Sequence, residues 1–425
     1  MMLCRAACCR RLFVRSLATE ASSSSVTSSE PPPYSLPQQQ QQQSQQPKQR
    51  TRLGPRPRPS PSQLHPLPEL PPSFGRNQIL PVSNSTRALL ESIVAQFNAP
   101  IRYAFAYGSG VFEQDGYNKP ATPGDPNSPM LDFMFAVTHP DHFHSINLQQ
   151  HASHYPLHAR LLGSDYVSRV QNIGPGVWFN AYVPMKGVTI KYGVTTVDNL
   201  CSDLLNWRTL YLAGRMHKPL RIIKDDARVR LTQQVNLTSA VRAALLTLPA
   251  EFTEVELFER IAGISYAGDP RMVLPAENRG KVGNIVRTQA PQFKELYHRL
   301  VVGLPGTHWP AHLSTIKQDT SPNARSAHLK KLPAGLLSRV QRSYASNSGL
   351  PSREKDENLY WVKMAEDANL AKAINKEMAT IVRAPATIQS LKGIVSAGVG
   401  KSTRYTLAKV RKWWKGVGNS KESSS

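Results

Sequence analysis

The sequence predicts a mixed α/β domain, then a mostly helical domain, and an amphipathic helix near the C-terminus. Three observations predict this order. Apolar runs of strand length occur before residue 200, segments with helical spacing follow residue 226, and residues 385–418 combine aromatic and basic side chains. A chain of 425 residues is long enough for two ordinary domains, and 40% hydrophobic residues exclude global disorder. No apolar run approaches the ~18 residues of a membrane-spanning helix.

The charge of the chain is strongly basic and is concentrated at its two ends. The formal net charge is +23. Residues 1–75 hold nine Lys and Arg against three Asp and Glu, and residues 383–425 hold nine against one. Nucleic-acid binding is the usual explanation for such a balance, but a basic terminus equally suits a membrane surface or a targeting receptor.

The first 20 residues have the composition of a targeting segment. Four arginines alternate with apolar residues, no acid precedes Glu20, and the pair Arg10-Arg11 interrupts any secretory apolar core. A disordered basic tail is the alternative. We expect a mitochondrial presequence over residues 1–20.

Residues 21–75 have low complexity. They contain a serine run, eight Gln within residues 38–46, and 13 of the 34 prolines. Such a segment cannot bury enough apolar surface to offset its ordering entropy, so we expect a disordered linker.

The first folded domain is predicted over residues 83–225, beginning with a helix over 83–98. Pro100 stops that helix, and the apolar run 101–107 predicts a strand. The strand ends at Tyr107 and is followed by Gly108, Ser109 and Gly110. A glycine turn exposes backbone N–H groups that suit close approach of a phosphate, although glycine turns after strands are common.

A second strand is predicted over residues 130–137, and it carries an acid. Asp132 stands among apolar residues, where a carboxylate is costly unless it is paired or binds a metal; capping a nearby turn is the alternative. A glycine turn followed by an acidic strand resembles the nucleotidyltransferase superfold, in which the turn binds a triphosphate and carboxylates bind Mg²⁺. That fold usually has two carboxylates two residues apart, but position 134 is methionine. The metal site must therefore be completed from elsewhere.

Two further strands are predicted over residues 177–183 and 188–194. Lys191 is central in the second strand. A lysine there is commonly an edge or snorkelling residue, but the sheet that carries Asp132 could turn it towards phosphates.

A helix is predicted over residues 198–213, and a short basic loop follows it. The loop contains Arg215, His217 and Lys218 after a glycine stop. These side chains form either a solvated turn or a charge clamp on a triphosphate.

The second domain is predicted over residues 226–305. Helical spacing over 237–248, 254–262 and 285–300 fits a winged-helix-like or helical cap. Winged helices often bind DNA, but no helix clusters Arg, Asn and Gln as a recognition helix does. We therefore expect closure over a nucleotide and no nucleic-acid partner.

The C-terminal part predicts two helical segments. Residues 354–384 are expected to pack on the body, and residues 385–418 to form a basic amphipathic membrane-contacting tail. Docking on the protein core is the alternative for the tail. The residues expected to contact the membrane are Leu407, Val410, Trp413, Trp414, Lys409, Arg411 and Lys412.

Six segments in one order carry a specific resemblance. Over roughly residues 89–302 and 381–414, the chain resembles the mitochondrial translocator assembly and maintenance family. The members of that family are phosphatidate cytidylyltransferases. The segments are YGSGVF (107–112), LDFMFAV (131–137), IKYGV (190–194), DLLNW (203–207), LYLAGR (210–215) and ISYAGD (264–269).

The resemblance implies a nucleotidyltransferase-type mixed sheet, a winged-helix-like domain and a membrane-contacting segment. It also implies CTP and phosphatidate as substrates and Mg²⁺ as the metal. Pro270 replaces a usual aromatic residue, and residues 276–281 match a family loop loosely. Residues 306–353 are expected to be a poorly ordered insertion, because from residue 307 they match poorly.

We expect the chain to transfer CMP from CTP to phosphatidate, giving CDP-diacylglycerol and pyrophosphate for phosphatidylglycerol and cardiolipin synthesis. Asp132 and Lys191 are the expected catalytic residues, and Asp132 is also the metal ligand. The expected nucleotide-binding residues are Tyr107, Gly108, Ser109, Gly110, Arg215, His217 and Lys218. The expected location is the matrix side of the mitochondrial inner membrane, bound peripherally to its anionic surface. Alternatives are a non-catalytic membrane-associated assembly factor and an RNA-directed nucleotidyltransferase.

Overall fold

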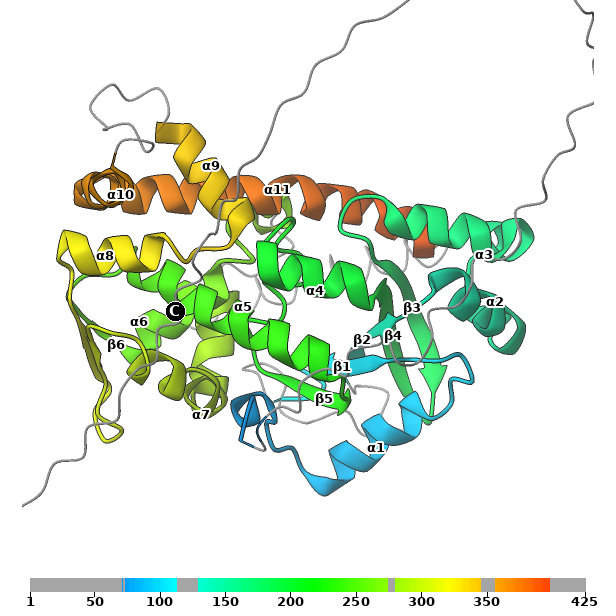
Figure 1. Cartoon of the computed structure of the whole chain (residues 1–425). Coiled ribbons are helices and arrows are strands. Elements are labelled where there is room, and N and C mark those ends of the chain that lie inside the picture. Colours follow the sequence, from blue (N-terminus) through cyan, green and yellow to red (C-terminus); the bar gives the residue numbers. More distant parts are fainter. Residues whose placement is uncertain (1–70, 72, 113–128, 274–279, 345–355, 398–425) are drawn as a thin grey trace, which may run out of the picture. The chain divides into compact units, whose positions relative to one another are not determined.

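The computed structural model describes residues 71, 73–112, 129–273, 280–344 and 356–397 (Figure 1). Among the helices in these ranges, none has both the length and the apolar character needed to cross a bilayer. The expected presequence, most of the expected linker and the tail beyond Ala397 lie outside the described residues.

A five-stranded mixed sheet forms the centre of the first part of the described chain. Its strand order is β3-β4-β2-β1-β5, with β2 parallel to β4 and the other neighbours antiparallel. Four of these strands were predicted from apolar runs. The fifth, β5, was not, because Arg221 and Lys224 interrupt the apolar pattern of its five residues LRIIK. The bounds are β1 Tyr103–Tyr107, β2 Leu131–Val137, β3 Trp178–Met185, β4 Val188–Thr196 and β5 Leu220–Lys224.

Helices cover this sheet (Figure 1). Helix α1 begins as expected after Ser83, whose Oγ accepts a hydrogen bond from Thr86 N at 3.2 Å. Two further helices lie between β2 and β3, in a segment where the sequence predicted no element. The bounds are α1 Asn84–Val94, α2 Pro140–Gln150, α3 Leu157–Asn172 and α4 Val197–Asn206.

Helix α4 ends earlier than the sequence predicted. It stops at Asn206, and Trp207 adopts a left-handed conformation with φ of 51°. The buried carboxylate of Asp203 then accepts backbone N–H bonds from Thr209, Leu210, Leu212 and Ala213 at 2.7–3.2 Å. The apolar spacing continued to residue 213, but these bonds satisfy the backbone of a compact turn instead.

The helical second part was predicted correctly in outline. Its three main helices are longer than predicted and are accompanied by a small antiparallel sheet of order β6-β8-β7. Glu256 and Thr253 form a capping box at the start of α6. The bounds are α5 Ala227–Leu245, α6 Glu254–Gly263, α7 Lys281–Val302, β6 Glu251–Thr253, β7 Thr307–His308 and β8 Thr315–Gln318.

The expectation of a poorly ordered insertion over residues 306–353 is wrong for residues 307–344. This stretch supplies β7 and β8, followed by α8 Pro322–Leu329 and α9 Ala334–Tyr344. Apolar side chains from it are fully buried in the main core, which explains why it folds. They include Ile316, Leu329, Leu336 and Val340.

Helix α10 Glu357–Glu366 and the start of α11 place Trp361, Met364 and Leu370 in the main core. Helix α11 spans Leu370–Ala397 and continues through Pro385, so the expected boundary before Pro385 is wrong. Lys392 Nζ donates to the carbonyls of Gln171 and Ile173 at 2.9 and 2.8 Å. Residues 385–392, assigned from the sequence to a membrane tail, therefore pack on the protein.

Candidate active site

Three polar side chains stand in one row across the sheet. Tyr107 on β1 pairs with Asp132 on β2, and Asp132 pairs with Lys191 on β4. Directly paired residues project from the same face of a sheet. Lys191 Nζ lies 3.6 Å from Asp132 Oδ1, and the two side chains keep 28% and 26% of their surface exposed. The row is therefore held in place by the sheet and is still accessible to a ligand.

The glycine turn after β1 lies against this row. Gly108 has φ of +88°, which favours glycine, and a Cβ built there would be 3.5 Å from Asp132 Oδ2. At Gly110 a Cβ would come within 2.8 Å of the Leu131 side chain and 3.2 Å of the Met130 carbonyl. The turn that carries Ser109 therefore packs closely on the start of β2, beside the carboxylate.

The position of the usual second carboxylate is apolar. Met134 is completely buried, and a Cβ at its paired residue Gly193 would touch both Met134 and Phe179 at less than 3.0 Å. Within the described residues, no group of three or more His, Cys, Asp and Glu side chains could hold a metal ion. Asp132 Oδ1 is nevertheless buried and accepts no hydrogen bond. An oxygen in that state fits a Mg²⁺ ion that takes one protein carboxylate and completes its shell with phosphate oxygens and water.

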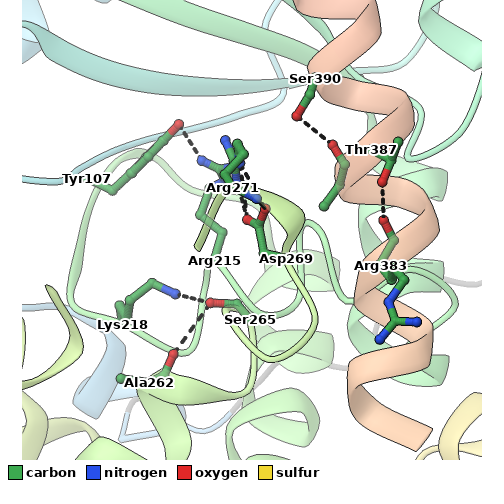
Figure 2. Close-up of polar contacts among 11 residues, drawn as sticks. Tyr107, Arg215, Lys218, Ala262, Ser265, Asp269, Arg271, Arg383, Thr387 and Ser390 are labelled. Carbon is green, nitrogen blue, oxygen red and sulfur yellow. Dashed lines mark hydrogen bonds and ion pairs between the residues drawn. The ribbon is translucent and has the colours of Figure 1, made fainter. Parts of the chain in front are cut away.

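Arg215 extends from the loop before β5 to the same row (Figure 2). Its Nη1 donates to the Tyr107 hydroxyl at 2.7 Å, and its guanidinium lies over the rings of Tyr107 and Tyr211, at 4.8 and 5.0 Å from their centroids. Burial alone lowers the pKa of Arg215, but the neighbouring Tyr107, Tyr211 and Asp132 outweigh burial and raise it above its ordinary value. Arg215 is therefore a fixed cation within the electrostatic reach of Asp132.

Lys218 adds a second cation from the same loop. Its Nζ donates to Gly214 O and Ser265 Oγ, both at 2.7 Å, and lies 5.0 Å from the centroid of the Tyr266 ring. Burial, and then the positive charges of Arg215 and Lys281, lower the pKa of Lys218 well below its ordinary value. The loop therefore places the Lys218 amine within the electrostatic reach of Arg215 and Lys281, an arrangement that a bound anion would stabilise.

The helical second part contributes a further cation, Arg271, which the sequence analysis did not assign to the site. Its Nε and Nη2 bond the buried carboxylate of Asp269 at 3.0 and 2.6 Å. Burial lowers the pKa of Arg271 and Arg215 acts in the same direction, but Asp269 raises it above its ordinary value. Figure 2 shows Arg271 and Asp269 beside Arg215. The resemblance segment 264–269 was the signal that could have identified this loop.

His217 is the expected site residue that the structure does not bring into this cluster. Its side chain has no exposed surface, its ring is tilted at 57° to that of Trp207, and its Nε2 hydrogen-bonds Asn236 Oδ1 at 3.0 Å. Burial and the charge of Lys218 lower its pKa to about 3. The loop thus turns the His217 side chain into the core, whereas Lys218 faces Ser265.

Comparison with known proteins identifies the family. The family model described as "Phosphatidate cytidylyltransferase, mitochondrial" matches residues 90–412. A Xenopus laevis protein of that name is 39% identical over 336 residues, covering 78% of this chain and 96% of the relative. The Rattus norvegicus protein is 38% identical, covering 77% and 95%, and the Saccharomyces cerevisiae protein is 34% identical, covering 80% and 74%. The chain therefore belongs to the mitochondrial phosphatidate cytidylyltransferase family, as its motifs suggested.

Proposed function

We propose that this protein is a phosphatidate cytidylyltransferase that makes CDP-diacylglycerol and pyrophosphate from CTP and phosphatidate. The observation that carries the proposal is the position of Asp132, beside the glycine turn at Gly108 and paired with Lys191. Family membership supports the choice of substrates, because the relatives bear that name.

The reaction exchanges one phosphorus–oxygen bond for another. A phosphatidate phosphate oxygen bonds to the α-phosphorus of CTP, the bond from that phosphorus to the bridging oxygen breaks, and pyrophosphate leaves with the electron pair. A phosphate oxyanion is already nucleophilic at neutral pH, so no strong general base is needed. The work of the protein is positioning and charge neutralisation.

Both the sheet-containing first part and the helical second part of the chain supply cations for positioning and charge neutralisation. Lys191 and Arg215, from the sheet and its loop, are assigned to the reacting phosphates, with Tyr107 orienting Arg215. Lys218 is assigned to the pyrophosphate end of the nucleotide together with the backbone of residues 108–110. Arg271 brings the second part of the chain to the nucleotide, in keeping with a winged-helix-like cap that closes over it.

Mg²⁺ is the proposed cofactor, and Asp132 is the residue that would hold it. When bound, the ion would neutralise charge on the triphosphate. Its other ligands are proposed to be substrate oxygens and water, because Met134 leaves no second carboxylate on β2.

Membrane association is proposed to be peripheral, on the matrix side of the mitochondrial inner membrane. The presequence over residues 1–20 supplies the address, and residues 398–418 supply basic and aromatic residues such as Trp413 and Trp414. The product would serve phosphatidylglycerol and cardiolipin synthesis. Trp413→Asp with Trp414→Asp is expected to weaken binding to liposomes.

The decisive experiment supplies CTP labelled on its α-phosphate, phosphatidate liposomes and Mg²⁺ to the purified protein. Label should enter the lipid extract, and Asp132→Asn should reduce the rate at least about a hundredfold. Asp198→Asn is the matched control, since Asp198 is an exposed residue of α4 whose carboxylate pairs with Arg228 on α5. Labelling of RNA ends without lipid would instead indicate an RNA-directed enzyme, and no turnover on either substrate would indicate a non-catalytic assembly factor.

A further inference from the structure

The most exposed apolar side chains of the described residues gather on two neighbouring elements. Five large hydrophobic residues are more than 50% exposed, and all belong to α3, to the residue that ends it, or to the end of α11. They are Leu161 (77%), Leu157 (68%), Leu391 (61%), Leu162 (59%) and Ile173 (54%). Single exposed leucines are ordinary, but a concentration of this kind marks a contact surface.

The first turns of α3 pack on a small buried core and hold their leucines facing outwards. Ala159 and Tyr155 are buried in a small core with Trp178, while Leu157 and Leu161, four residues apart, face outwards. Arg160 Nε donates to Tyr155 O at 2.9 Å, and Gly163 interrupts the helix with φ of +79°. The outward position of the leucines is therefore set by packing on their other side.

The contact between α3 and α11 connects this surface to the C-terminal tail. Lys392 bonds the last carbonyls of the α3 segment, and a Cβ at Gly174 would lie 2.6 Å from Ile388. Figure 1 shows the end of α11 beside α3. The described helix ends at Ala397, and the basic, Trp-containing residues 398–418 follow directly in the sequence. The described part of α11 therefore ends beside α3, with Lys392 at the C-terminal end of α3, where Ile173 is exposed.

The same helix connects this surface to the candidate active site. Gly268, in the loop before Asp269 and Arg271, packs on the backbone of α11 at Ala379. At 1.5 Å per residue, Lys392 lies about 20 Å further along α11. The part of α11 that contacts α3 is thus about 20 Å from the loop that precedes Arg271.

We propose that Leu157, Leu161 and Leu162 insert into the headgroup region of an anionic phospholipid bilayer, as a second membrane contact beside the tail. The choice of a bilayer as partner rests on the proposed function, whose substrate is a lipid. Two further features favour it. Arg160, next to Leu161, is exposed, and the single acid of α3, Asp165, is already paired with Arg169 at 2.8 Å. The described end of α11 also lies beside α3. Leucine with arginine suits the boundary between acyl chains and anionic headgroups.

The test compares Leu161→Asp with the unchanged full-length protein in flotation with phosphatidylcholine vesicles containing phosphatidate. Leu359→Asp is the control, because Leu359 is an exposed leucine on α10. Leu161→Asp should lower the bound fraction at least about tenfold, and Leu359→Asp should not. The Leu161→Trp variant should bind the vesicles at least as well as the wild type. Equal binding by the wild type and Leu161→Asp overturns the proposal.

Two further measurements distinguish loss of membrane contact from misfolding and from loss of a dimer as the cause of reduced flotation. CMP transfer to dihexanoyl phosphatidate below its micellar concentration needs no bilayer, so Leu161→Asp should keep the wild-type rate there; a comparable loss overturns the proposal in favour of misfolding. Size-exclusion chromatography tests a second copy as the partner, and a wild-type dimer that Leu161→Asp dissociates without loss of flotation also overturns it. If no variant transfers CMP, the proposed function fails, but flotation still shows whether Leu161 contacts the membrane. The two proposals can therefore fail independently.

Discussion

Lys191 Nζ lies 3.6 Å from Asp132 Oδ1, because the parallel strands β2 and β4 place the two residues in direct register. The ammonium group also lies 4.7 Å from the centroid of the Phe179 ring, which holds its stem beside the sheet. A cation that already neighbours the proposed metal ligand is placed to neutralise charge on a phosphate entering between them.

Replacing Lys191 should therefore affect catalysis more than stability. We expect Lys191→Met to lower kcat/KM for CMP transfer roughly a hundredfold, and Lys191→Arg to restore part of it. Lys186→Met is the control, since Lys186 is exposed in the turn of the same hairpin. Initial rates with labelled CTP give the comparison. A Lys191→Met rate within twofold of the wild type would contradict the assignment.

The turn at Gly108 should depend on its backbone conformation. Gly108→Ala places a side chain at φ of +88°, and Gly163→Ala does so at +79° with no atom within 4 Å of the new Cβ. Each should lower the free energy of unfolding by about 1–2 kcal/mol. Only Gly108→Ala should raise KM for CTP, because only that turn borders Asp132. Urea unfolding and rate measurements on both variants test this, and equal KM values would count against the turn as a phosphate site.

A carboxylate at position 134 should not improve the enzyme. Met134 is fully buried beside Phe179, so Met134→Asp buries an unpaired carboxyl group and should lower the free energy of unfolding by at least about 3 kcal/mol. Met134→Leu keeps the apolar contacts and should cost less than about 1.5 kcal/mol. Thermal unfolding and Mg²⁺-dependent activity are the measurements. Higher activity of Met134→Asp would show that the second metal ligand belongs at this position.

The buried amine of Lys392 should make stability depend on pH. Burial lowers its pKa from 10.5 to about 8, so between pH 8 and 10.5 the unfolded chain binds more protons than the folded one. Stability contributed by this group therefore rises with pH across that window, by at most about 3 kcal/mol.

Other groups titrate in the same pH window, so the contribution of Lys392 is measured as the difference in free energy of unfolding between the wild type and a variant without the amine. Lys392→Met should be less stable than the wild type, and the gap should widen from pH 7.5 to pH 10 in urea unfolding. Lys376→Met, at an exposed position of α11, should show no such trend. A gap between wild type and Lys392→Met that stays constant with pH would refute the lowered pKa.

Much of the local structure could be predicted from the sequence, because it depends on neighbours along the chain. Apolar runs bounded by glycine and proline correctly indicated β1 and β2, and the helix expected from residue 83 is α1, which follows Ser83. The end of α4 could not be predicted this way. It depends on Asp203 bonding four backbone N–H groups, which outweighs a helical apolar pattern that continues to residue 213.

The site shows the same division between local and tertiary information. Residue types alone marked Asp132, Lys191 and the glycine turn, and motif order marked the family. Tertiary structure separated His217, which is buried against Asn236, from its neighbour Lys218, and brought Arg271 to Arg215 from another part of the chain. Which polar side chains meet depends on strand register and on the paths of loops between elements, and those are set by packing between residues far apart in the sequence.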